Sequence, residues 1–224
     1  ALGVVNAFFL VRIFIIQHDC GHRTFVSNTK VRNIIGYISS IFSTIPYTYW
    51  AKSHHIHHSH NGQLEVRDIG DINTLTVEEY RALSTFGKLR YRLYRSWLVM
   101  FVLGPIYYVL IHNRLPLIKM EIFKKEKRRL LINNAILLAI FLTLGYFLGW
   151  GKFFITHFTV IALFSVIAIW FFYVQHQHEE AYKAWKDKWD YLTAALRGST
   201  YYKLPELFNW LTGYIGIHHI HHLN

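Results

Sequence analysis

Two long apolar segments, residues 130–150 and 153–174, are separated only by Gly151 and Lys152. Each is long enough to cross the hydrocarbon core of a bilayer as a helix, which takes roughly 17–25 residues. Because the connection is so short, the two helices must be antiparallel neighbours. The sequence therefore predicts a tight helical hairpin across a membrane, and the 53% content of hydrophobic residues agrees with this class of fold.

The first part of the chain, residues 1–16, is also apolar apart from Asn6 and Arg12. It is slightly short for a membrane span. The chain begins inside this apolar run and ends at Asn224, two residues after the last histidine. We therefore expect residues 1–224 to be a single membrane domain that is truncated at both ends.

Three clusters of histidine stand among these apolar segments. They are His18-Asp-Cys-Gly-His22, the run from His54 to His60, and His218-His219-Ile-His221-His222. On a helix, residues i, i+3 and i+4 share one face. This spacing places eight imidazoles in three convergent sets: His18 and His22, then His54, His57 and His58, then His218, His221 and His222.

Imidazole is the commonest metal ligand among protein side chains. At four to five ligands per ion, eight or nine histidines are enough for two metal ions. Imidazole binds iron but also zinc, copper and nickel, so the ligand type alone does not choose the metal. A pair of structural zinc ions is the alternative without redox chemistry. Carboxylates often orient ligating histidines, and the acidic residues near enough in sequence are Asp19, Asp68, Asp71, Glu179 and Glu180.

Positive charge predicts the orientation of the hairpin. The formal net charge is +11, and a run rich in Lys and Arg, residues 114–129, precedes the first span. Lys and Arg beside a span favour the cytoplasmic side, so this run and the segment after the hairpin are predicted to be cytoplasmic. In so apolar a chain, the charge indicates a membrane protein with a basic cytoplasmic face and not a nucleic-acid binder.

Two shorter apolar segments, residues 31–50 and 97–112, lie between the histidine clusters and this basic run. If either crossed the membrane once, the three clusters could not share metal ions on the cytoplasmic side. The first contains Pro46 and the second contains Gly104-Pro105, which interrupt helices. We therefore expect both segments to be re-entrant or interfacial.

A polar segment separates these two. Thr76 and Glu79 have the spacing of a capping box, which predicts a helix from there to about Arg95. Its Arg and Lys residues fit a helix that lies on the lipid headgroups. An ordinary solvated basic helix is the alternative.

The three clusters, in this order and spacing, resemble the three histidine boxes of the membrane fatty acid desaturases. The similarity covers nearly the whole chain. The stretches GDINTLTVEEY (residues 70–80), Gly104-Pro105, FYVQHQH (172–178), GSTYYKLP (198–205) and WLTG (210–213) resemble the bacterial acyl-lipid branch of that family.

The resemblance implies an all-α integral membrane protein: a four-helix bundle with a cytosolic, histidine-rich di-iron cap. It implies O2-dependent insertion of a cis double bond into the acyl chain of a membrane lipid. It also implies a ninth ligand just after the fourth span, where Gln175-His176 matches the family's Gln-His pair and His178 is the alternative. The predicted metal ligands are His18, His22, His54, His57, His58, His176, His218, His221 and His222.

The remaining histidines are predicted not to bind metal. On a helix, His55, His60 and His219 project away from the ligand face. His112 and His157 stand alone at the end of an apolar segment or within one, so we expect them to be packed and hydrogen-bonded.

Two other functions fit parts of the pattern. A di-iron membrane hydroxylase or oxygenase would act on an alkane, fatty acid or carotenoid. A histidine-rich metal transporter or sensor would carry ionisable residues inside its spans. Residues 130–150 argue against the second, because their polar residues are the uncharged Asn133, Asn134 and Thr143.

The sequence also indicates a partner. It contains no glycine-rich dinucleotide fingerprint and no haem or iron–sulfur spacing. Electrons must then come from a separate protein, such as a ferredoxin, a flavodoxin or a cytochrome-type donor. A basic cytosolic face would attract an acidic donor.

Overall fold

The computed structural model describes residues 1–223, which are helical with irregular connections and contain no strand. Here η1 is a π-helical turn, and η2 and η3 are 3-10 turns. The elements are α1 (Leu2–His22), α2 (Thr29–Ser43), α3 (Tyr47–His60), α4 (Val77–Ala82), α5 (Thr85–Tyr94), η1 (Val99–Leu103), α6 (Gly104–Leu110), η2 (His112–Arg114), η3 (Glu121–Phe123), α7 (Lys124–Leu148), α8 (Trp150–His176), α9 (Tyr191–Arg197), α10 (Glu206–Leu211) and α11 (His218–His221).

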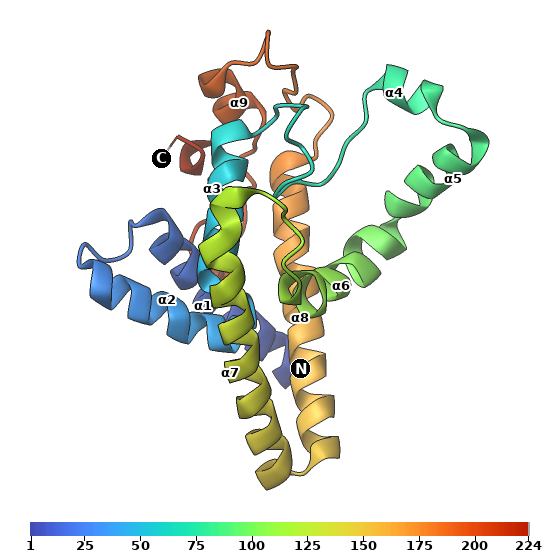
Figure 1. Ribbon diagram of the computed structural model, residues 1–224. Coiled ribbons are helices and arrows are strands. Elements are labelled where there is room, and N and C mark those ends of the chain that lie inside the picture. The colour runs from blue at the N-terminus through green and yellow to red at the C-terminus, as the bar shows by residue number, and fades with distance from the viewer. Residues whose placement is uncertain (224) are drawn as a thin grey trace.

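The predicted hairpin is present as α7 and α8, which extend together away from the rest of the molecule (Figure 1). Its turn is at Gly149, and the prediction of Gly151 and Lys152 was wrong by two residues. Gly149 has φ +84°, a conformation that glycine adopts without steric cost. Gly145 admits the ring of Trp150, since a Cβ at Gly145 would lie 2.3 Å from that ring. The reversal therefore occurs one turn after the small residue that makes room for it.

Three helical segments are long and apolar enough to cross a membrane: α1, Glu121–Leu148 and α8. A fourth candidate is the pair Thr85–Tyr94 and Val99–Arg114, which is bent by 51°. The bend lies at residues 95–98, at the start of the segment that was predicted to be re-entrant or interfacial. It is not at Gly104-Pro105, where η1 continues directly into α6, so the expectation that this pair interrupts the helix is wrong. The shape of the bent pair fits a re-entrant loop and a broken span alike, so the sidedness of the segment stays a prediction.

The other segment predicted not to cross as one helix, residues 31–50, is divided between α2 and α3. The break is at Thr44, whose φ is +57°, and Pro46 caps the start of α3. Neither helix is among the candidate spans. The apolar side chains of α2 are exposed at helical spacing: Val31, Ile34, Ile38 and Phe42. This surface suits a helix that lies among lipids.

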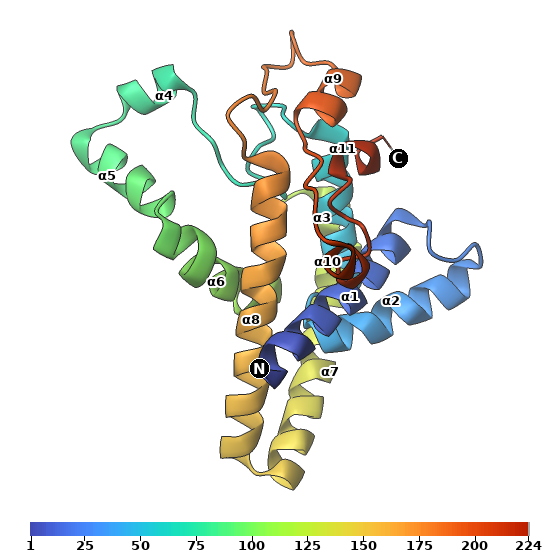
Figure 2. The ribbon, with the colours of Figure 1, turned by 180° about the vertical axis from the view of Figure 1, so that it is seen from behind.

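The predicted capping box at Thr76 and Glu79 is present at the start of α4. The predicted single helix to about Arg95 is wrong, because the chain breaks after α4 and Ser84 caps a second helix, α5. The Ser84 side chain accepts a hydrogen bond from the backbone of Gly87, and such caps start helices. Figures 1 and 2 show these two helices as an arm on the opposite side of α8 from α2.

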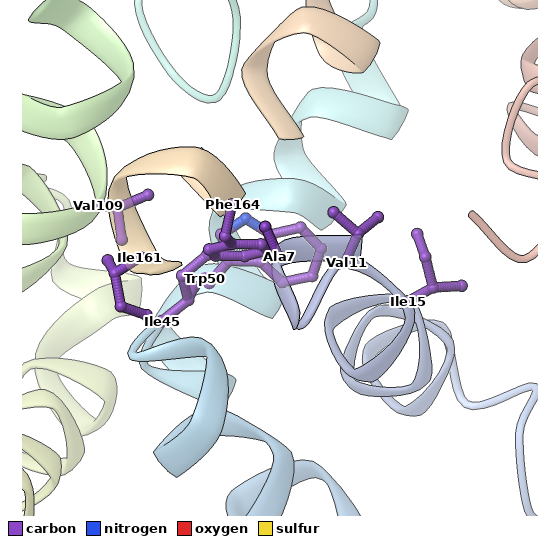
Figure 3. Packing of buried hydrophobic residues seen from close by; sticks show 8 residues of the cluster. All are labelled: Ala7, Val11, Ile15, Ile45, Trp50, Val109, Ile161 and Phe164. Carbon is purple, nitrogen blue, oxygen red and sulfur yellow. The ribbon is translucent and has the colours of Figure 1, made fainter. Parts of the chain in front are cut away.

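A hydrophobic core joins α1, α3, α6 and α8 (Figure 3). Val11 and Ile15 of α1 pack with Trp50 of α3 and with Phe164 of α8, which is completely buried. Ile15 lies three residues before His18, and Trp50 lies four residues before His54. The core therefore continues directly into the first two histidine clusters and fixes the helices that carry them.

Buried polar contacts hold α1 against the start of α3. Gln17 donates to the carbonyl of Ile45 at 3.0 Å, and the Ser43 hydroxyl donates to the side chain of Gln17 at 2.7 Å. The Tyr47 hydroxyl donates to the carbonyl of Cys20 at 3.0 Å. Because buried polar groups are costly unless paired, these bonds favour one relative position of the two helices.

The polar residues in α7 have partners within the protein. Asn133 donates to the Ser40 hydroxyl of α2 at 3.2 Å, and Asn134 donates to the carbonyl of Arg114 at 2.8 Å. The Arg114 guanidinium donates to both asparagine side chains and to the carbonyl of Thr44. These residues therefore connect α7 to the broken segment between α2 and α3.

Candidate metal centre

The structure brings the nine histidines that were predicted as ligands into two groups. In each group, one nitrogen from every side chain lies within 4.8 Å of the others. The first histidine group consists of His18, His22, His54, His58 and His221, and the second of His57, His176, His218 and His222. His176, not His178, belongs to the second group.

The histidine spacing explains how one helix serves both groups. His54 and His58 of α3 are one turn apart and enter the first group together, as His18 and His22 of α1 do. His57 lies about 100° around the helix from His58, and it enters the second group. The sequence predicted a common direction for the three α3 histidines, but their side chains diverge between the two groups.

The C-terminal histidine cluster is also divided between the two groups. His218 and His222 enter the second group, whereas His221 crosses to the first. α1 supplies ligands to the first group alone, and the end of α8 supplies His176 to the second. Both α3 and the segment around α11 thus contribute to both groups.

The Nε2 atoms within each group face one another. In the first group, Nε2 of His54 and His58 are 3.1 Å apart, and those of His18 and His221 are 3.0 Å apart. In the second group, Nε2 of His176 lies 3.2 Å from His57, 2.8 Å from His218 and 3.3 Å from His222.

Hydrogen bonding alone does not account for this arrangement. A neutral imidazole carries one N–H, so the Nε2 of His176 can satisfy at most one of the three nitrogens that surround it. An ion with nitrogen bonds of about 2.1 Å in a tetrahedron separates its ligand atoms by roughly 3.4 Å. The observed separations are close to that value, so both groups fit a metal ion at their centre.

Burial keeps these imidazoles in the form that binds metal. Burial, together with the neighbouring histidines, lowers the pKa of His57 to about 3 and that of His221 to about 2. Burial also lowers the pKa of the other group members outside the spans, His54, His58, His218 and His222. Metal ligation requires neutral imidazole, and these side chains are neutral at pH 7.

Few other residues contact the rings of these histidines and fix their orientation. Nδ1 of His18 bonds the Asp19 carboxylate at 2.8 Å, and Nδ1 of His176 bonds the carbonyl of Gly198 at 3.3 Å. The ring of Trp50 stacks on His54 with centroids 4.5 Å apart and planes 18° apart. Among residues 1–223, Nδ1 of His57, His58, His218 and His222 has no hydrogen-bond partner.

Of the acidic residues considered in the sequence, Asp19 alone among the described residues bonds a histidine of the two groups. Asp71 pairs with Lys183 at 3.6 Å, and Asp68 accepts a bond from Asn73. Glu179 and Glu180 are exposed. Trp50 and Gly198 were not predicted from the sequence as part of the site. Trp50 could have been found by helical spacing, because it lies one turn before His54, but nothing local in the sequence marks the carbonyl of Gly198.

The histidines expected not to bind metal lie outside both groups. His55 is exposed, His60 bonds the carbonyl of Ile56 at 3.0 Å, and His219 is partly buried beside Tyr201. His112 stacks on Tyr108, and His157 stacks on Phe153. Both are packed as expected, but the expected hydrogen bonds are not found: within residues 1–223 neither ring makes one, and a buried ring nitrogen of each has no partner.

An apolar cavity of about 400 Å³ reaches the histidines. α1, α3, α6 and α8 contribute just over half of its wall, including Phe14 and Phe172. Met100 of η1 and residues 68–72 also line it. His18 and His54 of the first group and His218 of the second group line the same cavity. Its volume is in the range of small-molecule sites, and its lining suits a hydrocarbon chain more than a polar ligand.

Within residues 1–223, three candidate spans and two histidine groups that could bind metal, beside an apolar cavity, define a helical membrane protein with a histidine-rich centre. Comparison with known proteins identifies the family. The model of the fatty acid desaturase family matches residues 1–224, and the chain belongs to this family.

Three relatives show the range of similarity. The chain is 42% identical over 224 residues to a fatty acid desaturase of Bacillus subtilis (strain 168), covering all of this chain and 63% of that protein. It is 25% identical to the sn-1 oleoyl-lipid 12-desaturase of Synechocystis sp., covering 96% of this chain and 60% of the relative. It is 27% identical to the sn-1 acyl-lipid omega-3 desaturase (ferredoxin) of the same organism, covering 94% and 58%. The chain thus spans about three-fifths of the length of these relatives.

Proposed function

We propose that this chain forms the catalytic part of a membrane enzyme that introduces a cis double bond into the acyl chain of a membrane lipid. One observation carries the proposal: the apolar cavity is lined by histidines of both groups. A hydrocarbon chain in this cavity would lie against the edge of the metal centre. Family membership and the names of the relatives, which include lipid desaturases, support the same reaction.

We propose iron in both groups, held by the nine histidines, and residues 1–224 as one domain, since each group needs histidines from distant parts of the chain. Iron supplies the redox chemistry with O2 that removal of hydrogen from an unactivated methylene requires, whereas zinc has none. The overall reaction consumes O2, two electrons and two protons, removes two hydrogens from the acyl chain and forms two molecules of water.

The residues of the chain have separate tasks in this reaction. Phe14, Met100 and Phe172 surround the acyl chain and exclude water from the methylenes. Asp19 fixes the ring of His18 through the bond at Nδ1, so that Nε2 faces the first group. Gly198 does the same for His176 in the second group.

We further propose a multi-pass protein with both histidine groups on the cytoplasmic face. The hairpin returns the chain to the side from which it entered, because the basic run extends into the first turns of α7 and α8 ends at His176. The positive-inside rule places that side in the cytoplasm. Electrons then come from a cytosolic donor of the ferredoxin, flavodoxin or cytochrome type, and the printed name of one relative includes ferredoxin.

Product analysis tests the proposal. The protein is expressed in a host that makes saturated and monounsaturated lipids, and the fatty acids are analysed by mass spectrometry. We expect a product two mass units lighter than its precursor, with the new double bond at one position. A product sixteen mass units heavier would instead identify a hydroxylase and overturn the proposal.

Matched variants link the product to the histidines. His57→Ala and His221→Ala should abolish the product and lower bound iron, because each removes one nitrogen from a group. His55→Ala and His219→Ala, in the same two clusters but outside both groups, should retain substantial activity. Equal losses in all four variants would refute the ligand assignment.

A further inference from the structure

A second cavity, of about 590 Å³, adjoins the first histidine group. Its wall comes from the end of α1, the start of α2, the middle of α3 and the start of α7, and it includes His22, His54 and the exposed His55. The two cavities share one lining residue, His54. A single imidazole of the first group therefore faces the apolar cavity and also this second cavity.

The second cavity is basic. Arg23, Arg32, Lys52 and Arg129 line it from four different elements, against one carboxylate, Glu126. Glu126 lies 3.9 Å from Lys52 and 3.7 Å from Arg129, so it offsets part of the charge. Three cations remain in excess, and Arg23 and Arg129 are exposed.

Arg32, the remaining arginine of this cavity, is held in place by hydrogen bonds to the residues just before it. The Arg32 guanidinium donates to the carbonyls of Val26 and Ser27 at 3.0 Å and 3.3 Å and to the Thr29 hydroxyl at 3.1 Å. Its charge is thus fixed at the wall of the cavity. Lys52 and Arg129 stand on α3 and α7, and Arg23 follows the end of α1. Cations spread over several segments suit a broad anionic surface more than a single small anion.

From this arrangement we infer that the basic cavity, defined by Arg23, Arg32, Lys52 and Arg129, is the docking site of an acidic one-electron carrier protein. The inference rests on the proposed function, which requires an outside source of electrons. Here the carrier would lie against His22 and His54 of the first group while the acyl chain occupies the apolar cavity, which is also lined by His54. Reductant and substrate would then reach one centre without competing for space.

The number of electrons in the reaction determines how many times a carrier must bind this site. A [2Fe–2S] carrier is oxidised by one electron in each encounter. Two encounters therefore supply two electrons. Together with two protons from solvent and two hydrogens from the acyl chain, these electrons convert O2 into two molecules of water. The oxidised carrier must leave between encounters, so a rim of partly solvated charges is more useful than a tight apolar interface.

Binding of a plant-type ferredoxin to the metal-free protein in a nonionic detergent tests the docking site without turnover. Arg129→Glu and Arg23→Glu should each raise the Kd about tenfold and weaken its salt dependence, because reversing a rim charge mainly changes steered association. Arg128→Glu is the matched control, since Arg128 is exposed on the same turn of α7 but does not line the cavity. It should change the Kd by less than about twofold.

Turnover separates the docking site from the proposed function. Arg129→Glu should lose ferredoxin-driven desaturation but keep single-turnover desaturation driven by dithionite, which needs no docking. If the unaltered protein desaturates with neither reductant, the proposed function fails, and the binding measurements still decide the docking site.

Two results would overturn the inference. One is ferredoxin binding by Arg129→Glu and Arg23→Glu that equals binding by the unaltered protein. The other is unchanged ferredoxin binding together with lost binding to vesicles that contain phosphatidylglycerol, which would assign the cavity to an anionic lipid headgroup.

Discussion

The bond between Nδ1 of His18 and the Asp19 carboxylate is the clearest external contact of the first histidine group. Asp19→Asn keeps an oxygen acceptor of the same shape but removes the charge. A hydrogen bond to a charged group contributes about 1.5–3 kcal/mol. The His18 side chain is 4% exposed but that of Asp19 is 39% exposed, so screening by water favours the low end of that range. About 1.5 kcal/mol corresponds to roughly a tenfold change in an equilibrium constant.

Asp19→Asn should therefore weaken iron binding at the first group about tenfold. It should leave unchanged the affinity with which the second group binds iron while the first group is empty, because Asp19 contacts no histidine of the second group. Competition with a chelator of known affinity, followed by iron analysis, measures both sites. Glu180→Gln is the control, since Glu180 is exposed and outside both groups. Unchanged iron affinity in Asp19→Asn, or an equal loss at both sites, would refute the orienting role of the carboxylate.

Three further predictions concern the ligands, the topology and the response to acid. His176→Ala should lower bound iron and remove activity, whereas His178→Phe should be tolerated; the reverse result would move the ligand to His178. Cysteines at Lys125 and Lys152 should be labelled from opposite sides of the membrane, the first from the cytoplasm, and labelling of both from one side would refute the hairpin topology. Acidification from pH 6.5 to 5 should lower the melting temperature of the metal-free protein, because unfolded histidine takes up protons that folded histidine, with a lowered pKa, does not. For His57, with a pKa of about 3, this amounts to about 2 kcal/mol, and a melting temperature independent of pH in this range would contradict it.

The sequence predicted those features of the fold that depend on local pattern. The hairpin of α7 and α8, the break at Pro46 and the cap at Thr76 all follow from apolar length or from a residue with one strong conformational preference. The turn at Gly149 was misplaced because glycine at 149 and at 151 are equivalent in a hydropathy pattern. Packing of Trp150 against Gly145 decides between them.

The histidines of the site could be predicted from the sequence, but not how they divide between the two groups. Helical spacing identifies His54, His57 and His58 as neighbours, yet the 100° between adjacent residues lets the last two point to different centres. The wall of the apolar cavity comes from four helices and several connecting segments that are distant in sequence. No local pattern encodes such a surface, so Phe14 and Phe172 could be recognised only from the structure.

The crossing of ligands between the two groups has a consequence for assembly. α11 is only four residues long, and a helix this short is not stable in isolation. If an ion bound the second group through His218 and His222, it would order this segment and bring His221 to the first group. An ion that then bound the first group would not bear the entropy cost of ordering α11. Iron loading should consequently be positively cooperative, with a sigmoidal titration, and His221→Ala should make it hyperbolic.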